Sequence, residues 1–208
     1  MSTTTMKHIY KAGSLPDAPT LLLLHGTGGN ENDLIGLASL IAPGAAILGV
    51  RGNVSENGMP RFFRRLAEGV FDEPDLIART AELGSFLDAA AEEYGFDRAN
   101  VYALGYSNGA NIAASLMFHR AGVFKGAILH HPMVPLRGLE LPDLNGLPVF
   151  IGAGENDPIV SRSETEELAS LLSGAGADVE IHWERQGHQL TRTEAEAAAA
   201  WFKAQNPA

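Results

Sequence analysis

The sequence GYSNG at residues 105–109 has the spacing of a nucleophilic serine on a sharp turn between a strand and a helix. An apolar run of strand length, residues 101–104, ends directly before it, and a segment with helical periodicity begins at Asn108. Glycine at both ends of such a turn removes the Cβ atoms that would collide with the backbone. The serine Oγ then lies at the positively polarised start of the helix. We therefore predict that Ser107 is a nucleophile.

A serine hydroxyl needs an adjacent base to remove its proton, and the expected order along the chain is serine, carboxylate, histidine. His188 follows the predicted strand 179–183 in the sequence QGHQ, so it stands at a strand end and late in the chain. We therefore predict His188 as the general base. The other histidines precede the candidate acid, or lie before the sheet, at a helix end or inside a strand: His8, His25, His119, His130, His131 and His182.

The carboxylate that orients the base should follow a strand between the serine and the histidine. The sequence GAGENDPIV, which directly follows the predicted strand 149–151, offers Glu155 and Asp157. Asp157 is favoured because Pro158 restricts the chain after it and the apolar residues 159–160 can anchor the loop. With Asp157, the sequence predicts a complete serine–histidine–aspartate triad.

The sequence HGTGG at residues 25–29 follows the first apolar run and predicts one side of an oxyanion hole. Such a hole needs two N–H donors beside the carbonyl oxygen, and a turn with few side chains lets the backbone approach a substrate. We expect the N–H of Thr27, with Gly28 as the alternative, and the N–H of Asn108 after the nucleophile. A phosphate-binding loop is disfavoured because neither the Walker lysine nor the GxGxxG spacing is present.

Two further groups of residues carry weaker signals. Adjacent residues on a strand point to opposite faces, so His130 and His131 are interpreted as polar residues at a strand end and not as a metal site. The basic residues Arg61, Arg64 and Arg65 can bind an acidic group of a substrate, although a solvated face is the commoner arrangement for arginine.

Apolar runs of strand length alternate with segments of helical periodicity along the chain. The runs are continuous, which is typical of strands buried on both faces of a parallel sheet. Asn32 or Asp33 is expected to cap the first helix, and Ser163 and Thr193, each with a glutamate three residues on, to cap the last two. The predicted strands are residues 20–24, 45–50, 101–104, 127–129, 149–151 and 179–183, and the predicted helices are residues 33–41, 74–94, 108–118, 163–173 and 193–203.

This order predicts an α/β protein with an open, mostly parallel sheet, helices on both faces and a site at the carboxyl ends of the strands. Residues 1–208 suit a single domain without a separate cap domain, because the sheet and its helices use most of the chain. The segment 51–73 has no clear period and is expected to wall the site. Phe62 and Phe63 are adjacent in it, so one of them is expected to face the serine and bound a small acyl pocket.

Charge and composition exclude several classes of protein. The formal net charge is −10, which disfavours nucleic acid and anionic membrane surfaces as partners. Residues 1–13 lack the apolar segment of a secretory signal, and no apolar run reaches the ~20 residues that span a bilayer. The chain is 45% hydrophobic and contains no cysteine, so we expect a cytoplasmic globular protein.

Several motifs in register are more specific than any one of them. The chain resembles the small carboxylesterase/phospholipase branch of the α/β-hydrolases, which includes the acyl-protein thioesterases, over LLLLHGTGGNENDL, RGNVSENGMPRFFRR, GYSNGANIA, HPMVP, GENDPIV and GHQLT. It is most similar to bacterial carboxylesterases, since the thioesterases usually carry glutamine after the nucleophile and HGLGD in the oxyanion turn, where this chain has Asn108 and HGTGG. The resemblance implies Ser107, Asp157 and His188 as the triad, and Thr27 and Asn108 as oxyanion donors. It also implies no metal or organic cofactor, and a homodimer as a common state.

The favoured hypothesis is an α/β-hydrolase fold that carries a serine carboxylesterase, which hydrolyses small carboxylic esters through an acyl-enzyme. A thioesterase or lysophospholipase that uses the same site is the alternative. A non-enzymatic binding module on this scaffold would require a broken triad, whereas all three residues are present.

Overall fold

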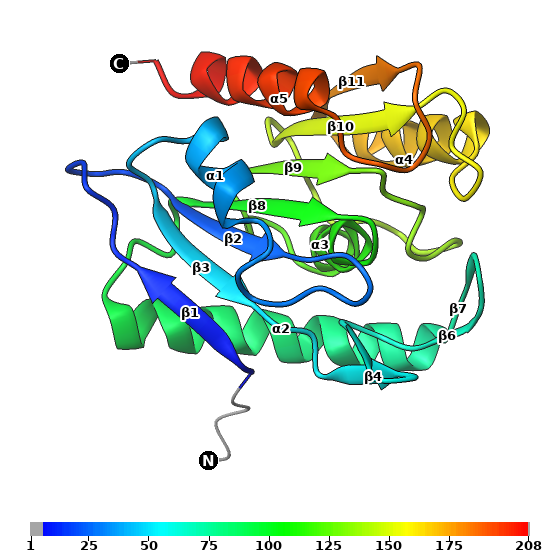
Figure 1. The fold of residues 1–208 in the computed structure, drawn as a ribbon, viewed down its shortest axis with the longest axis horizontal. Coiled ribbons are helices and arrows are strands. Elements are labelled where there is room, and N and C mark those ends of the chain that lie inside the picture. Colours follow the sequence, from blue (N-terminus) through cyan, green and yellow to red (C-terminus); the bar gives the residue numbers. More distant parts are fainter. Residues whose placement is uncertain (1–5, 208) are drawn as a thin grey trace.

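The computed structural model describes residues 6–207, in which helices cover both faces of a central sheet (Figure 1). Within these residues the sheet has seven strands in the order β1-β3-β2-β8-β9-β10-β11. Neighbouring strands are parallel, except that β1 runs antiparallel to β3, so the predicted mostly parallel sheet is confirmed. The strands are β1 (His8–Lys11), β2 (Thr20–Leu24), β3 (Ala46–Val50), β8 (Val101–Tyr106), β9 (Gly126–His130), β10 (Pro148–Gly154) and β11 (Asp178–Glu184).

The strand order of the sheet reverses at β2. The chain leaves β2, crosses to β3 on one side, and later returns to β8 on the other side. A crevice forms at the carboxyl ends of parallel strands where the strand order reverses in this way. The turns after β2 and β8 therefore lie side by side, with Leu24 in register with Gly105.

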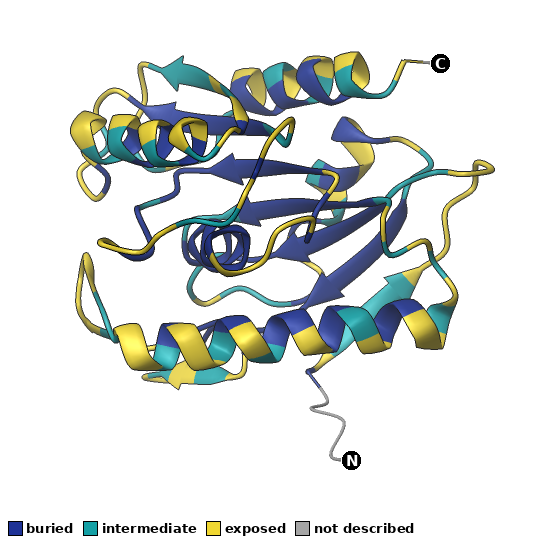
Figure 2. Cartoon of the chain, turned by 180° about the vertical axis from the view of Figure 1, so that it is seen from behind, coloured by how far each residue is buried: buried dark blue, intermediate teal, exposed yellow. Residues whose placement is uncertain are grey.

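Two layers of helices enclose the sheet. Leu83 of α2, Ile112 of α3 and Leu168 of α4 belong to one apolar core, whereas Ala38 of α1 and Trp201 of α5 belong to the core on the other face. Figure 2 shows that the central strands are buried and the edge strands partly exposed, while the outward sides of α2, α4 and α5 are exposed. Among residues 6–207, no helix combines the length and apolar character needed to cross a lipid bilayer. The helices are α1 (Ile35–Ile41), α2 (Glu73–Tyr94), α3 (Asn108–His119), α4 (Arg162–Gly174) and α5 (Arg192–Gln205).

The starts of α4 and α5 correct the predicted capping residues. Ser161 caps α4 in place of Ser163, and Thr191 caps α5 in place of Thr193. The Thr191 hydroxyl accepts the N–H of Glu194 at 3.1 Å. The sequence holds a Ser/Thr-x-x-Glu pattern in both registers, so the local pattern cannot choose between them. The observed register of α5 turns Glu194 into the interior, where it is fully buried.

The start of α1 also differs from the prediction. The helix begins at Ile35 and has no side-chain cap, whereas Asn32 or Asp33 was the expected cap. The Asp33 carboxylate instead accepts hydrogen bonds from the backbone N–H of Asn30 at 3.1 Å and from its side-chain amide at 2.6 Å. Asp33 therefore stabilises the turn that precedes the helix.

The segment 51–73, which has no clear period in the sequence, forms two hairpins. In the first turn Asn57 and Gly58 have φ angles of 51° and 84°, the backbone that an Asn-Gly pair favours in tight hairpins. Strands this short give almost no periodic signal in the sequence. The short strand β1 was not predicted for the same reason. The paired strands are β4 (Val54–Glu56) with β5 (Met59–Arg61), and β6 (Arg65–Ala67) with β7 (Val70–Phe71).

The first turn of α3 lies directly on the backbone of β2, and this contact generates a prediction. A Cβ at Gly109 would lie 1.9 Å from the carbonyl oxygen of Leu24, whereas a Cβ at Gly36 in α1 would meet nothing within 4 Å. Gly109→Ala should lower the free energy of unfolding by about 1–3 kcal/mol or more, or prevent folding, because the helix must move away from the sheet.

Gly36→Ala is the matched control and should raise the free energy of unfolding by about 0.5–1 kcal/mol, because it removes a flexible residue from a helix. Urea unfolding followed by circular dichroism measures both changes. A Gly109→Ala protein as stable as the wild type would contradict the close contact.

Candidate active site

The carboxyl ends of neighbouring strands bring together residues that are far apart in the sequence. Thr27 follows β2, Ser107 follows β8, Asp157 follows β10 and His188 follows β11. The strand β9 lies between β8 and β10, and His131 directly follows it at the same edge. The site therefore occupies the position that the fold class favours.

Ser107 occupies the sharp turn between β8 and α3 with φ 51° and ψ −114°. A residue with a side chain rarely adopts a positive φ, so the surrounding structure must impose this backbone. The Ser107 N–H donates to the carbonyl of His130 at 2.9 Å. A Cβ at Gly105 would lie 2.7 Å from the backbone of Ala110, so only glycine permits this approach of strand and helix. The turn thus presents the Ser107 hydroxyl in the crevice.

His188 lies within hydrogen-bonding distance of the serine. Its Nε2 is 2.8 Å from Ser107 Oγ, and its Nδ1 is 2.7 Å from Asp157 Oδ2. The Tyr106 hydroxyl donates to the backbone carbonyl of His188 at 2.7 Å and holds the loop that carries it. The structure therefore brings together the serine, histidine and aspartate expected from the sequence.

The Asp157 carboxylate is held on both of its oxygens. Oδ1 accepts the backbone N–H groups of Ile159 at 2.8 Å and Val160 at 3.0 Å, the loop residues expected to anchor it. Oδ2 faces both His188 and His131, the latter at 3.1 Å. Burial alone would raise the pKa of Asp157, but the hydrogen bonds from Val160, Ile159 and His188 outweigh it and lower that pKa. Asp157 is therefore ionised at neutral pH.

Other histidines have partners away from the serine. His25 is buried, donates from Nδ1 to the carbonyl of Gly26 at 2.6 Å, and accepts the N–H of Gly52 on Nε2 at 3.0 Å. Burial lowers the pKa of His25, which agrees with this neutral tautomer. Three more histidines bind neighbours on their own elements or across the fold: His8, His119 and His182.

The two expected oxyanion donors lie at the neighbouring ends of β2 and β8. Asn108 is the first residue of α3, so its N–H has no acceptor within the helix. The N–H of Gly28, the alternative donor, is occupied by the carbonyl of Pro60 at 2.9 Å. Among the described residues the N–H of Thr27 makes no hydrogen bond. The geometry therefore favours Thr27 over Gly28.

Arg61 supports the oxyanion turn in a way that the sequence did not reveal. Its guanidinium donates to Thr27 Oγ1 and to the carbonyl of Phe63 at 3.1 Å, and it pairs with Glu56 at 3.3 Å. Arg61 is buried, and burial lowers its pKa to about 10, so it keeps its charge at neutral pH. The interpretation of the arginines as a solvated face holds for the exposed Arg64 but is wrong for Arg61.

A pocket of about 280 Å³ opens over Ser107, with Phe71, Met133 and Ile159 among its apolar lining residues. The structure does not bring Phe62 and Phe63 into this lining, because both side chains turn into the core and are 1% and 0% exposed. The Phe62 ring packs on His25, with ring centroids 4.8 Å apart. The Phe63 ring packs edge-on against Phe71 at 4.9 Å. Phe71 therefore lines the pocket in place of Phe62 and Phe63, and Phe63 packs against Phe71 from the core.

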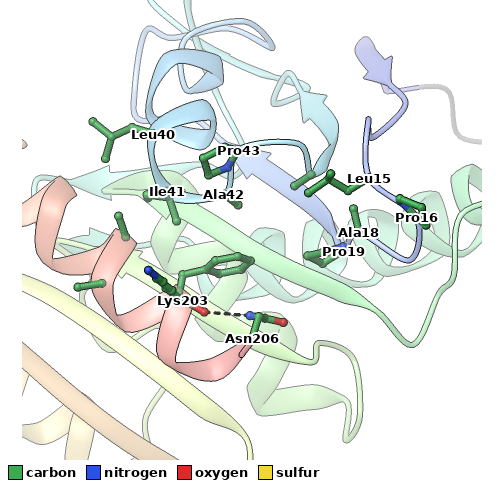
Figure 3. A pocket seen from close by; sticks show the side chains of 14 residues that line it. Leu15, Pro16, Ala18, Pro19, Leu40, Ile41, Ala42, Pro43, Lys203 and Asn206 are labelled. Atoms are coloured by element: carbon green, nitrogen blue, oxygen red, sulfur yellow. Dashed lines mark hydrogen bonds between the residues drawn. The ribbon is translucent and has the colours of Figure 1, made fainter. Parts of the chain in front are cut away.

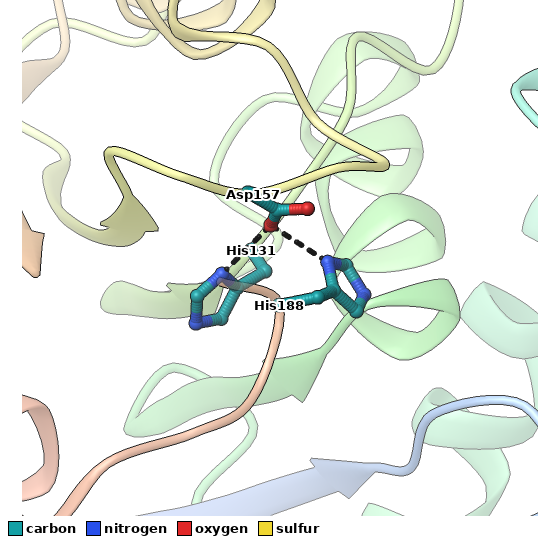
Figure 4. A group of neighbouring side chains, drawn as sticks. All are labelled: His131, Asp157 and His188. Carbon is teal, nitrogen blue, oxygen red and sulfur yellow. Dashed lines mark hydrogen bonds and ion pairs between the residues drawn. The ribbon is translucent and has the colours of Figure 1, made fainter. Parts of the chain in front are cut away.

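The structure corrects the interpretation that His130 and His131 face opposite ways. The strand β9 ends at His130, and His131 has a φ of 53°, so both rings contact Glu194. Figure 4 shows His131 and His188 on two sides of the Asp157 carboxylate. The ligand atoms of these three residues lie within 4.8 Å of one another, a spacing that a metal site also has. The Nδ1 atoms of His131 and His188 both donate to Asp157 Oδ2, so the three residues form a hydrogen-bonded network.

A larger pocket, of about 640 Å³, lies at the amino ends of β2 and β3, between α1, α5 and the β1–β2 connection (Figure 3). Its lining is mostly apolar, with Leu15, Leu40 and Phe202 on its walls and Lys203 at its edge. It contains no serine, histidine or carboxylate side chain. Among the described residues, the candidate nucleophile Ser107 and the candidate base His188 line the smaller pocket instead.

The strand order and the serine at the strand-to-helix turn define an α/β-hydrolase. A family model described as the dienelactone hydrolase family matches residues 74–206. MhqD of Bacillus subtilis (strain 168) is 62% identical over 198 residues, which are 95% of this chain and 98% of MhqD.

Two crystal structures extend this comparison. The Bacillus cereus carboxylesterase is 62% identical with a TM-score of 0.95, over 96% of this chain and 94% of that one. A carboxylesterase from Mesorhizobium loti is 33% identical with a TM-score of 0.85, over 90% and 88%. The chain belongs to the dienelactone hydrolase family. The predicted resemblance to bacterial carboxylesterases and the prediction of a hydrolytic enzyme are confirmed.

The side chain of Asn108 generates a prediction about stability. Its Oδ1 accepts the buried N–H of Phe62 at 2.7 Å and ties the segment after β5 to the start of α3. Asn108→Ala should lower the free energy of unfolding by about 1–3 kcal/mol, because the Phe62 N–H loses its acceptor. Asn145→Ala, at an exposed loop residue, should change it by less than about 0.5 kcal/mol. Equal urea midpoints for the two variants would show that the contact does not stabilise the fold.

Proposed function

We propose that this protein is a serine carboxylesterase that hydrolyses small carboxylic esters. The observation that carries the proposal is the position of His188, with Nε2 2.8 Å from Ser107 Oγ and Nδ1 2.7 Å from Asp157. A carboxylate on Nδ1 fixes the tautomer in which Nε2 has a free lone pair, and this lone pair faces the hydroxyl proton. Nucleophile, base and orienting acid are then Ser107, His188 and Asp157.

In the proposed reaction, Ser107 Oγ attacks the ester carbonyl carbon while His188 Nε2 takes the hydroxyl proton. His188 then returns that proton to the leaving alcohol as the carbon–oxygen bond breaks, which leaves an acyl group on Ser107. A water molecule attacks the acyl group with the same assistance from His188. The products are a carboxylic acid and an alcohol, and the enzyme is regenerated.

The negative oxygen of each tetrahedral intermediate requires N–H donors. We assign this role to the backbone N–H groups of Thr27 and Asn108. The hydrogen bonds from Arg61 to Thr27 and from Phe62 to Asn108 hold both donors in place before the substrate binds. Preorganised donors need no rearrangement as charge develops, which is the main source of their effect on rate.

Pocket size supports a small acyl group. A volume of about 280 Å³ lies at the lower end of the range for small-molecule sites, and the lining mixes Phe71 and Met133 with Arg65 and Glu68. The Bacillus cereus and Mesorhizobium loti relatives are carboxylesterases by name, which supports an ester as the substrate class. A long acyl chain would extend beyond the apolar walls into water.

The nucleophile is tested by Ser107→Ala. This variant should fold as the wild type does and lose about 10⁴-fold or more in kcat/KM for 4-nitrophenyl acetate. It should also fail to react with a fluorophosphonate probe. Ser85→Ala, at an exposed serine of α2, should keep full activity and labelling. More than a tenth of wild-type activity in Ser107→Ala would refute the assignment.

Acyl-chain preference is tested with nitrophenyl esters of rising acyl length. Each methylene buried against the pocket wall contributes about 0.8 kcal/mol, or about fourfold in kcat/KM, until the pocket is full. We expect an optimum at short chains, and Phe71→Ala should move it to longer ones. Val70→Ala is the matched control, because Val70 is adjacent but 51% exposed. A steady rise to long chains in the wild type would favour the lysophospholipase or thioesterase alternative.

A further inference from the structure

Asp157 has a second imidazole partner that the triad does not require. Its Oδ2 lies 2.7 Å from His188 Nδ1 and 3.1 Å from His131 Nδ1. On its other side the His131 ring places Nε2 3.1 Å from Glu194 Oε2, and Glu194 Oε1 faces His130 Nδ1. A continuous chain of hydrogen bonds therefore runs from the serine through the triad to a buried glutamate.

The partners of His131 determine its charge. An ionised carboxylate only accepts hydrogen bonds, and His131 has a carboxylate oxygen on each ring nitrogen. Both nitrogens must therefore carry a proton, which makes the ring an imidazolium between Asp157 and Glu194. Burial lowers the pKa of His131, but the contacts with Glu194 and Asp157 outweigh it and raise that pKa. For Glu194, burial raises the pKa, yet hydrogen bonds from His130 and His131 lower it to about 2.

The backbone conformation nearby accommodates the contact between His131 and Glu194. A Cβ at Gly152 of β10 would lie 1.9 Å from Glu194 Oε1, so the position of the glutamate requires glycine there. His131 reaches both carboxylates only because its φ is 53°, a strained value for a residue with a side chain. Glu194 sits where a capping-box glutamate would turn back to the start of its helix, yet its carboxylate binds the two histidines instead.

The groups that face His131 come from every element packed around it. Asp157 lies after β10 and Glu194 in the first turn of α5. The ring of His188, after β11, is 5.2 Å away between centroids, and the ring of Tyr106, at the end of β8, is 6.0 Å away. His130, at the end of β9, contacts the same glutamate. The positive charge of His131 is therefore enclosed by two carboxylates and lies close to the base.

We propose that His131 and Glu194 are positioning residues of the esterase, which hold the Asp157 carboxylate in the orientation that meets His188. This inference rests on the proposed function, because it assigns no independent chemistry to the pair. A second donor on Oδ2 fixes the direction in which the carboxylate meets His188. The His131 cation also lies close to the His188 ring, with centroids 5.2 Å apart, so we expect removal of its charge to change the pH profile of the reaction.

The pH dependence of kcat/KM tests the charge. Its acid limb reports protonation of the base in the free enzyme. His131→Asn keeps an amide donor near the position of Nδ1 but removes the cation, so the acid limb should move to higher pH by about one unit. The double variant with Glu194→Gln also removes the facing anion and should move the limb by less. His182→Asn, at a histidine that pairs with Glu184 on β11, should leave the limb in place.

A second measurement needs no variant and no activity. In wild-type protein with ¹⁵N-labelled histidine, the His131 ring, assigned through its contact with Tyr106, should show two ring N–H protons and imidazolium ¹⁵N shifts at pH 7. A neutral His131 ring at pH 7 would overturn the proposal, and so would an unmoved acid limb in a folded His131→Asn protein. Full activity of Ser107→Ala would refute the proposed function itself. Loss of activity in Ser107→Ala with an unmoved acid limb would refute the positioning role alone.

Discussion

The close approach of α3 to the sheet is the constraint on which the site depends. Because the helix begins against the backbone of β2 and β8, the residue before it must turn with a positive φ, and that residue is Ser107. The same turn directs the Ser107 N–H to the carbonyl of His130, which ties β8 to the end of β9. The hydroxyl then lies in the crevice between strand ends, where the loops after the later strands place His188 and Asp157. Gly105 and Gly109, which permit this contact, therefore determine how the Ser107 hydroxyl meets side chains from distant parts of the chain.

The sheet, and the proximity of the three residues that we propose as a triad, could be predicted from sequence because their signals are strong and concordant. Continuous apolar runs of this length are typical of strands buried on both faces, and every predicted strand is present. Chain order, together with a position just after a strand, separated His188 from six other histidines, and the structure places it beside Ser107. Order along a chain is informative here because parallel strands end at one edge, so successive strands must deliver their residues to the same place.

Features that depend on side-chain direction could not be predicted in this way. His131 follows a strand in the sequence, but its left-handed backbone turns the ring toward Glu194. No local sequence pattern predicts that turn. Phe62 and Phe63 are adjacent, yet both face the core because the chain leaves β5 in an irregular path. The starts of α4 and α5 were displaced because overlapping capping patterns compete, and only tertiary burial of residues such as Glu194 selects one.

The two hairpins between β3 and α2 contact different parts of the candidate site, although they are adjacent in the chain. The first is bound to the reacting centre, since Arg61 holds Thr27 and the N–H of Phe62 holds Asn108. The second contributes Phe71 to the pocket wall. Substitutions in β6 and β7 can therefore change which acyl groups the pocket admits, while the contacts of Thr27 and Asn108 are kept. The first hairpin offers no such freedom, so divergence among relatives should concentrate in the second.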